Sequence, residues 1–315
     1  MRITVAGSGA MGCRFGGALF SAGHDVLLLD GWREHVDAIN TGGLRVSDET
    51  GSRMIRVPAA LFPAADDPAD LVIVFTKATA TASVAAAAAG AIGPSTLVLT
   101  LQNGLGNIEV LRSYVPKERL LAGTTTLGTE LLGPGHIRAL GSGETVLGAL
   151  GPGSSDHAER TVLALSAAGL PARVAADALA VIWAKVAFNC VMNSLCAIAS
   201  IPVSALARYD GFDALASSIL REVAAVAAAE GVAVDIAAAL RLMKAQFDPA
   251  ASGSHLASTL QDLMNGRPTE IAQLNGAIAA RAQAHGIEAP LNALVAQLVG
   301  LLEATWPSRV NRLHR

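Results

Sequence analysis

Short apolar runs alternate with longer helical patterns through the first half of the chain. Residues 3–6 form an apolar run, a glycine-rich turn and a helical pattern follow as far as residue 22, and residues 25–29 form a second run. Residues 71–75 and 96–100 are further continuous apolar runs. Such runs are typical of parallel strands buried on both faces of a sheet. Because they alternate with helical segments, they predict a doubly wound α/β domain.

The pattern changes after about residue 150. A loop rich in glycine, proline and serine precedes one more helical pattern and a short strand at residues 171–174. From residue 176 onward nearly all of the chain has helical periodicity, with alanine- and leucine-rich segments separated by glycines and prolines. We therefore expect a sheet domain over residues 1–175 and an all-helical domain over residues 176–315.

The first turn carries the pattern G-x-G-x-x-G. Gly7, Gly9 and Gly12 follow a strand and open a helix, the context in which this pattern binds the pyrophosphate of a dinucleotide. The first glycine permits a tight turn, the second lets the pyrophosphate approach the backbone, and the third lets helix and strand pack closely. Free N–H groups at the helix N-terminus also favour phosphate. The pattern predicts a Rossmann-type domain. Its predicted cofactor contacts are Gly7, Ser8, Gly9, Ala10, Met11 and Gly12.

Two residues near the end of the second strand bear on the choice of dinucleotide. Asp30 ends that strand, where an acid accepts a hydrogen bond from the ribose 2′-OH of NAD and would repel the 2′-phosphate of NADP. Arg33 could instead reach a 2′-phosphate, or it is a solvated residue at a helix start. Asp30 taken alone favours NAD.

Residues 183–193 form an apolar helical pattern that is interrupted on one face. Lys185, Asn189 and Asn193 are spaced four residues apart, and at 3.6 residues per turn they line one stripe. Burying an ammonium group and two amides is costly unless partners satisfy them, and a polar substrate supplies such partners. The alternative is a stripe that faces solvent, but the helix carries no other charge. A lysine there can donate a proton to a carbonyl oxygen as a hydride reaches the carbon.

Three further polar residues are candidates for the same site. Glu270, which we expect in the first turn of a helix, could hold the lysine protonated, although the helix dipole alone also favours an acid there. Asn103 and Lys77 each follow a predicted strand, and ligands of open α/β sheets bind at such ends. Asn103 could equally be a turn residue. Lys77 meets the cofactor or the substrate, or it is solvated.

Composition limits the location and the partners. The chain is 52% hydrophobic and only 16% charged, with a formal net charge of -3, against about 25% charge in average soluble proteins. That balance argues against nucleic acid as a partner. Residues 78–108 and 186–207 carry no charge and exceed the roughly 20 residues of a membrane span, but glycine, proline and amide residues interrupt both. We expect a cytoplasmic protein with no membrane segment.

The cysteines form no recognisable site. Cys13, Cys190 and Cys196 make no C-x-x-C motif and no cluster with histidine. A free cysteine commonly behaves as a small apolar core residue. We therefore predict three reduced thiols in the core and no metal site. Apolar helices in the second domain would allow a homodimer.

Motifs that extend over nearly the whole chain resemble a known family. The matching segments are Gly7-x-Gly9-x-x-Gly12, Phe75-Thr76-Lys77, Gln102-Asn103-Gly104-x-Gly106, Pro134-Gly135, Trp183-x-Lys185-x-x-x-Asn189-x-x-x-Asn193, Ser258-Thr259-Leu260-Gln261-Asp262 and Arg267-Pro268-Thr269-Glu270-Ile271. Together they resemble the ketopantoate reductase (2-dehydropantoate 2-reductase) family. The last three are specific to this family, whereas many dehydrogenases share the glycine motif.

The resemblance implies a Rossmann domain followed by a helical domain, with the active site in the cleft between them. It also implies NADPH-dependent reduction of 2-dehydropantoate to (R)-pantoate, a step towards pantothenate and coenzyme A. In the family, the residue matching Lys185 is the general acid, and the one matching Glu270 supports that lysine and the substrate hydroxyl. The family residues that hold polar groups of the substrate match Asn103, Asn189, Asn193 and Ser258. We also expect Asn103 and Lys77 to contact the cofactor.

The sequence departs from the family pattern at one position that matters. Many members carry a basic residue near the end of the second strand, where this chain has Asp30. Either Arg33 compensates for the missing base, or the protein prefers NADH. The family also contains reductases of other 2-oxo acids, and no side chain in the sequence identifies the substrate. A non-catalytic dinucleotide-binding sensor is a further alternative, but a sensor would not need the lysine, the asparagines and Glu270.

Overall fold

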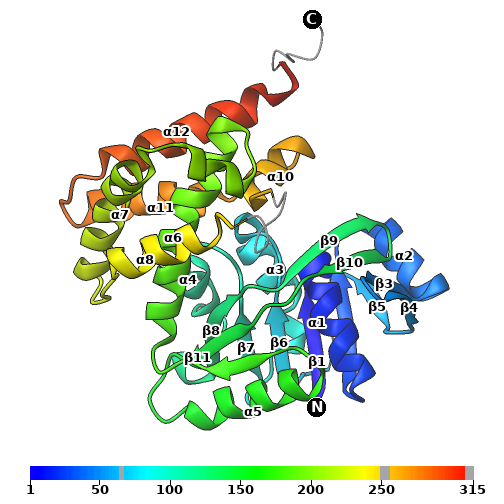
Figure 1. Cartoon of the computed structure of the whole chain (residues 1–315). Helices are drawn as coiled ribbons and strands as arrows, with labels where there is room; N and C mark the ends of the chain where they lie inside the picture. The colour runs from blue at the N-terminus through cyan, green and yellow to red at the C-terminus, as the bar shows by residue number, and fades with distance from the viewer. Residues whose placement is uncertain (64–66, 249–255, 309–315) are drawn as a thin grey trace, which may run out of the picture. The chain divides into compact units, whose positions relative to one another are not determined.

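The apolar runs of the first half of the chain form the centre of one large sheet (Figure 1). The computed structural model describes residues 1–63, 67–248 and 256–308. Strands of this sheet lie in the order β12-β11-β8-β7-β6-β1-β2-β5, and β11 pairs antiparallel with β8, whereas the other neighbours are parallel. The strands are β1 (Arg2–Ala6), β2 (Asp25–Asp30), β5 (Ala59–Leu61), β6 (Leu71–Val74), β7 (Leu97–Thr100), β8 (Leu120–Thr125), β11 (Thr145–Ala149) and β12 (Ala172–Val174).

The strand order fixes where a ligand can bind. From β5 to β8 the sheet runs β5-β2-β1-β6-β7-β8, which is the order of doubly wound dinucleotide-binding sheets. The order reverses between β1 and β6, and ligands of such sheets bind outside the carboxyl ends of the strands at that point. Gly7 follows β1, and Lys77 follows β6 after two further residues. The expected fold class is confirmed.

Helices cover both faces of this sheet (Figure 1). Helices α1 (Ala10–Ser21) and α5 (Ser155–Ala167) pack on one face, and α3 (Thr81–Ala87) and α4 (Asn107–Leu111) pack on the other. Continuous burial on both faces explains why the central strands contain no polar alternation.

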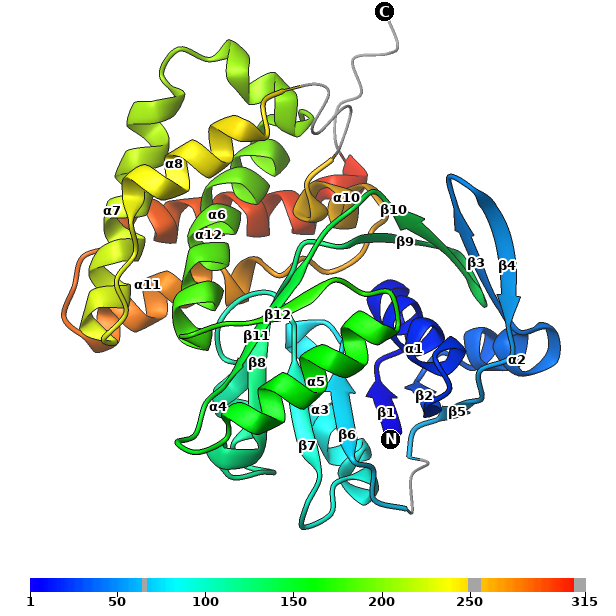
Figure 2. The same ribbon diagram turned by 60° about the horizontal axis from the view of Figure 1, so that its bottom comes forward.

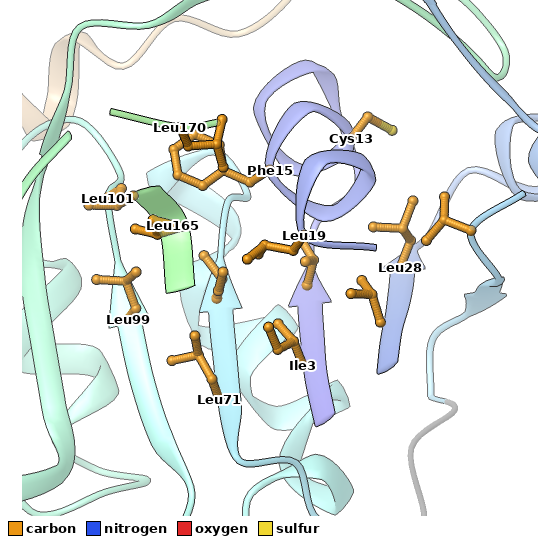
Figure 3. Close-up of a cluster of buried hydrophobic side chains, with 14 of the residues drawn as sticks. Ile3, Cys13, Phe15, Leu19, Leu28, Leu71, Leu99, Leu101, Leu165 and Leu170 are labelled. Carbon is orange, nitrogen blue, oxygen red and sulfur yellow. The ribbon is translucent and has the colours of Figure 1, made fainter. Parts of the chain in front are cut away.

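Figure 3 shows the core on the α1 face. Leu19 of α1 lies above the sheet near Ile3 and Leu71, Leu99 belongs to the next strand of the same cluster, and all four side chains are buried. Burying a leucine or isoleucine side chain contributes about 1.5–3 kcal/mol, so this layer anchors α1 on the sheet. The anchored helix fixes the glycine turn between β1 and α1.

A second, smaller sheet was not predicted. Its strands lie in the order β4-β3-β10-β9. Half of its strands come from residues 44–55 and half from residues 128–140, and β3 pairs in parallel with β10. Their side chains are largely half-buried or exposed, so no continuous apolar run marks them. The strands are β3 (Leu44–Asp48), β4 (Gly51–Ile55), β9 (Gly128–Gly133) and β10 (His136–Leu140), and α2 (Arg33–Gly42) precedes β3.

A separate compact part contains residues 103–105 and the described residues from 183 onward. It is helical, and α11 packs against α7 and α12 (Figure 2). The two compact parts divide within α6, after Ile182, and the expected boundary after residue 175 stays a prediction. The helices are α6 (Ala178–Ala199), α7 (Phe212–Ala229), α8 (Ile236–Ala245), α10 (Ser258–Met264), α11 (Asn275–Ala284) and α12 (Pro290–Thr305).

Helix α6 has clear start and stop signals. The side chain of Asp177 accepts hydrogen bonds from the N–H groups of Leu179 and Ala180 at its start. Beyond its end, Ser200 takes a left-handed conformation with φ 55°, which terminates helices. Among the described residues α6 alone is long and apolar enough to cross a membrane, and 61% of its most apolar stretch is buried inside the protein. That burial is what the core helix of a folded domain shows.

Candidate active site

The glycine turn after β1 has the geometry of a phosphate cradle. Gly7 has φ 97°, which favours glycine, and a Cβ there would lie 2.7 Å from the backbone nitrogen of Thr76. A Cβ on Gly12 would lie 2.0 Å from the carbonyl oxygen of Gly7, whereas a Cβ on Gly9 would meet nothing within 4 Å. Gly7 and Gly12 are thus required because a side chain at either position would clash with the protein's own backbone. At Gly9 no protein atom is close, so the space there is open to a ligand.

The donors and the acid of this cradle suit a dinucleotide. The first N–H groups of α1 have no acceptors within the helix, and they favour phosphate. Ser8 donates its hydroxyl to Oδ2 of Asp30 (3.2 Å), and the N–H of Trp32 donates to Oδ1 (3.0 Å). Both carboxylate oxygens keep acceptor capacity, since each can accept more than one hydrogen bond. The residues present therefore fit a nicotinamide dinucleotide.

Two basic residues lie near the same strand ends. Arg33 is the first residue of α2 and is exposed, and Lys77 is exposed directly before a short 3-10 turn. Gln102 supports the loop that carries Lys77, because its amide donates to the Thr76 carbonyl and to the Thr81 hydroxyl (both 2.8 Å). Gln102 of the family motif thus has a structural contact in this protein.

The predicted polar stripe lies on α6. Asn189 and Asn193 are 6% and 8% exposed, and Lys185 is partly exposed on the same helix face. Lys185 is the helix's only charged residue. Burying an amide side chain is costly unless it forms hydrogen bonds inside the protein or with a ligand. The two asparagines therefore lie mainly within the protein and do not form a solvated face.

The electrostatics of Lys185 depend on burial and on Glu270. Burial lowers the pKa of Lys185 from its ordinary value of 10.5 to about 8, while the negative charge of Glu270 acts in the opposite direction. Glu270 is only 7% exposed, and its Oε2 accepts a hydrogen bond from Nδ2 of Asn103 (3.1 Å). The three residues come from segments far apart in the sequence. The ammonium group is still protonated at pH 7 and can lose its proton readily.

The expectation that Glu270 lies in the first turn of a helix is wrong. It precedes a short 3-10 turn, Ile271–Gln273, and α11 begins only at Asn275. The carbonyl of Glu270 accepts the N–H groups of Gln273 and Leu274, and Leu274 then departs from helical geometry with ψ -108°. The acid is therefore held by its surroundings, with little contribution from a helix dipole.

Two carboxylates hold the segment that leads into Glu270. Asp262, which is 4% exposed, accepts a hydrogen bond from Nε of Arg267 (3.1 Å). Oε2 of Glu303 accepts both the hydroxyl (2.5 Å) and the N–H (3.0 Å) of Thr269. Sequence reasoning missed Glu303, although a signal exists: it is the only charged residue of α12, just as Lys185 is of α6.

The stripe on α6 has one more partner from a distant segment. Nδ2 of Asn193 donates to Oγ of Ser258 (3.0 Å), and Ser258 is an exposed residue at the start of α10. The structure thus brings Asn103 together with Glu270 and Asn193 together with Ser258. The chain's candidate proton donor, Lys185, interacts with the first of these pairs.

Family models agree with this architecture. A model described as ketopantoate reductase PanE/ApbA matches residues 3–152, and a model of the C-terminal domain of ketopantoate reductase PanE/ApbA matches residues 177–303. The chain belongs to the ketopantoate reductase family. The protein is accordingly an NAD(P)-dependent oxidoreductase with a Rossmann-type domain.

Individual relatives cover nearly the whole chain. The 2-dehydropantoate 2-reductase of Lactococcus lactis is 35% identical over 302 residues, which are 95% of this chain and 97% of that relative. The enzyme of the same description from Halobacterium salinarum is 36% identical over 304 residues, 96% of this chain and 99% of that relative.

Solved structures give a complementary comparison. A D-mandelate dehydrogenase solved with NADH and anilino(oxo)acetate is similar with a TM-score of 0.94 and 34% identity, over 98% of this chain and all of that one. A PanE/ApbA family ketopantoate reductase from Ralstonia eutropha JMP134 has a TM-score of 0.86 and 37% identity, over 98% of this chain and 100% of that one.

Proposed function

We propose that this protein reduces the ketone of 2-dehydropantoate to give (R)-pantoate, in the cytoplasmic route to pantothenate and coenzyme A. One observation carries the proposal: a single ammonium group, Lys185, shares a helix face with two buried amides and interacts with a buried carboxylate, Glu270. The reactions of the relatives support it, since those from Lactococcus lactis and Halobacterium salinarum are named 2-dehydropantoate 2-reductases.

In this mechanism Lys185 supplies the proton. When bound, the reduced nicotinamide supplies the hydride that reaches the carbonyl carbon of the substrate. The ammonium group of Lys185 donates its proton to the ketone oxygen, which becomes the hydroxyl of the product. Glu270 keeps the lysine protonated and accepts the Asn103 amide. In this proposal Asn103, Asn189, Asn193 and Ser258 donate to or accept from the polar groups of the substrate.

The pH dependence of reduction follows from the pKa of Lys185, which is about 8. The acid form is the active one, so kcat/KM for reduction is expected to be constant below about pH 8 and to fall tenfold per pH unit above it. For oxidation of the hydroxy acid the sign reverses, because the neutral amine must accept the proton. Steady-state rates in both directions between pH 6 and 10 test this, and parallel profiles in the two directions would contradict the assignment.

We further propose that the cofactor is NADH. The carboxylate of Asp30 is held in place by Ser8 and Trp32, where it suits the two ribose hydroxyls and repels a 2′-phosphate. The NADH complex of D-mandelate dehydrogenase supports this choice. Initial rates with NADH and NADPH test it, and a strong preference for NADPH would assign the dominant role to Arg33 instead.

A second candidate function is reduction of a different 2-oxo acid. The TM-score of 0.94 to a D-mandelate dehydrogenase favours substrates with a bulky or aromatic group beside the ketone. The test is a panel of kcat/KM values for 2-dehydropantoate, for the aromatic 2-oxo acid that corresponds to mandelate, and for pyruvate. The highest value with 2-dehydropantoate supports the first proposal, and a value at least tenfold higher with the aromatic acid supports the second.

A further inference from the structure

A buried histidine lies behind the glycine cradle. His35, in the first turn of α2, is 1% exposed. The N–H of Gly135 donates to its Nδ1 (3.1 Å), and its Nε2 lies 2.9 Å from the carbonyl oxygen of Ser8. Because Nδ1 acts as the acceptor, the ring proton is on Nε2 and is donated to Ser8. Burial lowers the pKa of His35 against the opposing effects of Asp30 and of the Ser8 contact, which keeps the ring neutral at pH 7.

Contacts from His35 lead back to Asp30 by two routes. In the first, His35 contacts the carbonyl oxygen of Ser8, and the hydroxyl of the same Ser8 donates to Oδ2 of Asp30. Through Trp32, the imidazole stacks on the indole ring at a centroid distance of 5.3 Å and an interplanar angle of 12°, and the Trp32 N–H donates to Oδ1 of Asp30. Asp30, Ser8, His35 and Trp32 therefore form a closed circuit, in which both Ser8 and His35 are buried.

The indole ring of Trp32 is held in place but remains accessible. Its residue is 39% exposed, although tryptophan is highly buried on average. One face is occupied by the His35 ring, and the contact to Asp30 fixes the backbone at the same residue. Trp32 is two residues past the acid expected to meet the adenosine ribose, and an aromatic face stacks on nucleic-acid bases of any kind.

We propose that Trp32 stacks on the adenine ring of the bound dinucleotide and that His35 is the positioning residue that holds Trp32 and Ser8 for this contact. The ligand class is an adenine-containing dinucleotide. The proposal rests on dinucleotide binding by the Rossmann-type domain and is independent of the 2-oxo acid that the enzyme reduces. The turn between β9 and β10 takes part, because Gly135 belongs to it and orients the His35 ring.

The first test measures binding of the adenosine half and of the nicotinamide half of the cofactor separately. Trp32→Leu keeps an apolar side chain and the backbone N–H but removes the aromatic face. We expect the dissociation constants of NADH and ADP-ribose to rise about tenfold and that of nicotinamide mononucleotide to change less than twofold. Trp32→Phe restores most of the affinity for ADP-ribose. The matched control is Tyr209→Leu, which removes another exposed aromatic residue and leaves all three constants unchanged. Wild-type affinity of Trp32→Leu for ADP-ribose would overturn the proposal.

A spectroscopic signature reports the stacking directly. ADP-ribose has no nicotinamide, so quenching of tryptophan emission when it binds comes from a ring near adenine. We expect quenching in the wild-type protein and in Tyr209→Leu, and its loss in Trp32→Phe, which retains the other two tryptophans. Quenching that persists in Trp32→Phe would place the adenine elsewhere.

The positioning role of His35 is tested by a conservative pair. His35→Gln can still donate to Ser8 from the place of Nε2, whereas His35→Leu removes all three polar contacts, those to Ser8, Gly135 and the Cys13 thiol. We expect His35→Leu to raise the KM for NADH about tenfold and the KM for the 2-oxo acid less than twofold, and we expect His35→Gln to restore most of the affinity. Equal effects of both variants, or equal increases in both KM values, would show a merely structural role. If His35→Leu does not fold, His35→Gln and the Trp32 variants still decide the question. Failure of the wild-type protein to bind NADH would instead contradict dinucleotide binding itself.

Discussion

In the proposed function, the glycine cradle and the polar stripe of α6 recognise their ligands in opposite ways. The cradle uses main-chain N–H groups and empty space at Gly9, and its shape follows from three glycines within six residues. The stripe uses side chains, and the pKa of Lys185 depends on the charge of Glu270, which accepts the amide of Asn103; both partners come from distant segments. A site made of main-chain groups adds little free-energy cost once the turn is formed, because it buries no polar side chain. A side-chain site in an apolar helix must offset the burial of polar groups with partners supplied by the rest of the fold.

The two sites also differ in what holds them. Apolar packing of α1 on the sheet fixes the cradle. The segment that carries Glu270 is instead held by two carboxylates, Asp262 and Glu303. The comparison predicts that main-chain variants in the cradle change folding or cofactor binding, whereas side-chain variants around α6 change turnover and its pH dependence.

The largest expected effect is that of Lys185→Ala. Removing the proposed general acid is expected to lower kcat by about 10²-fold or more, because in the proposed mechanism Lys185 supplies the proton to the ketone oxygen. The dissociation constant of NADH stays unchanged, since the cradle contains no atom of this side chain. Steady-state rates and a fluorescence titration measure the two quantities. Near-normal turnover would remove Lys185 from the mechanism.

Two alanine variants of the cradle separate packing from ligand space. In Gly12→Ala the new Cβ would overlap the carbonyl oxygen of Gly7, so we expect a loss of about 1–3 kcal/mol of stability, measured by urea unfolding without cofactor. In Gly9→Ala the Cβ points into open space and φ is -63°, so stability stays at the wild-type value and the Kd for NADH rises about tenfold or more. Equal unfolding free energies for the two variants would contradict this division.

Glu270→Gln removes a charge but keeps an oxygen that can accept the Asn103 amide. Because Glu270 raises the pKa of Lys185, its loss lowers that pKa, and we expect the inflection of kcat/KM for reduction to move from about pH 8 to about pH 7. Measurements of kcat/KM between pH 6 and 9 follow it. An inflection that stays at pH 8 would mean that the two groups do not interact in the active enzyme.

The smallest expected effect is a loss of stability, and it is tested at two carboxylates that connect α12 to other segments. Glu303 accepts from Thr269, next to Glu270, and Glu222 accepts the N–H groups of Leu291 and Asn292 at the start of α12. Each is partly buried, and Glu303→Ala and Glu222→Ala should each cost about 1–2 kcal/mol of stability. Only Glu303→Ala should also lower the pH inflection, and Glu303→Gln should restore it. A similar shift in Glu222→Ala would indicate a general loosening of the helices.

Prediction from the sequence succeeded where the chemistry is local. The glycine turn, the strands on each side of it and the position of Lys185, Asn189 and Asn193 on one helix face all depend on residues within a few turns of one another. Glu270 shows where local prediction fails: the sequence identifies it as a candidate partner of Lys185 but predicts the wrong local structure for it. Nearby residues predict a helix start, whereas the structure has a short 3-10 turn after Glu270, and Asp262 and Glu303 hold the residues just before it.

The second sheet and the role of His35 could not be predicted from local patterns, because both depend on contacts between distant segments. Pairing of β3 with β10 joins residues about 90 positions apart, and its half-exposed strands lack a continuous apolar run. The His35 ring is oriented by Gly135 from the turn of that sheet, so its sequence neighbourhood identifies only a residue of α2.

The sequence by itself determined the strand–turn–helix unit and the class of cofactor, and it identified Lys185 as the candidate proton donor. These properties follow from backbone conformation and side-chain periodicity, which are set over short stretches of chain. Only the tertiary structure decided that Asn103 meets Glu270 across 167 positions and that Asn193 meets Ser258 across 65. Such pairs depend on how helices and loops pack, and packing is a property of the whole fold.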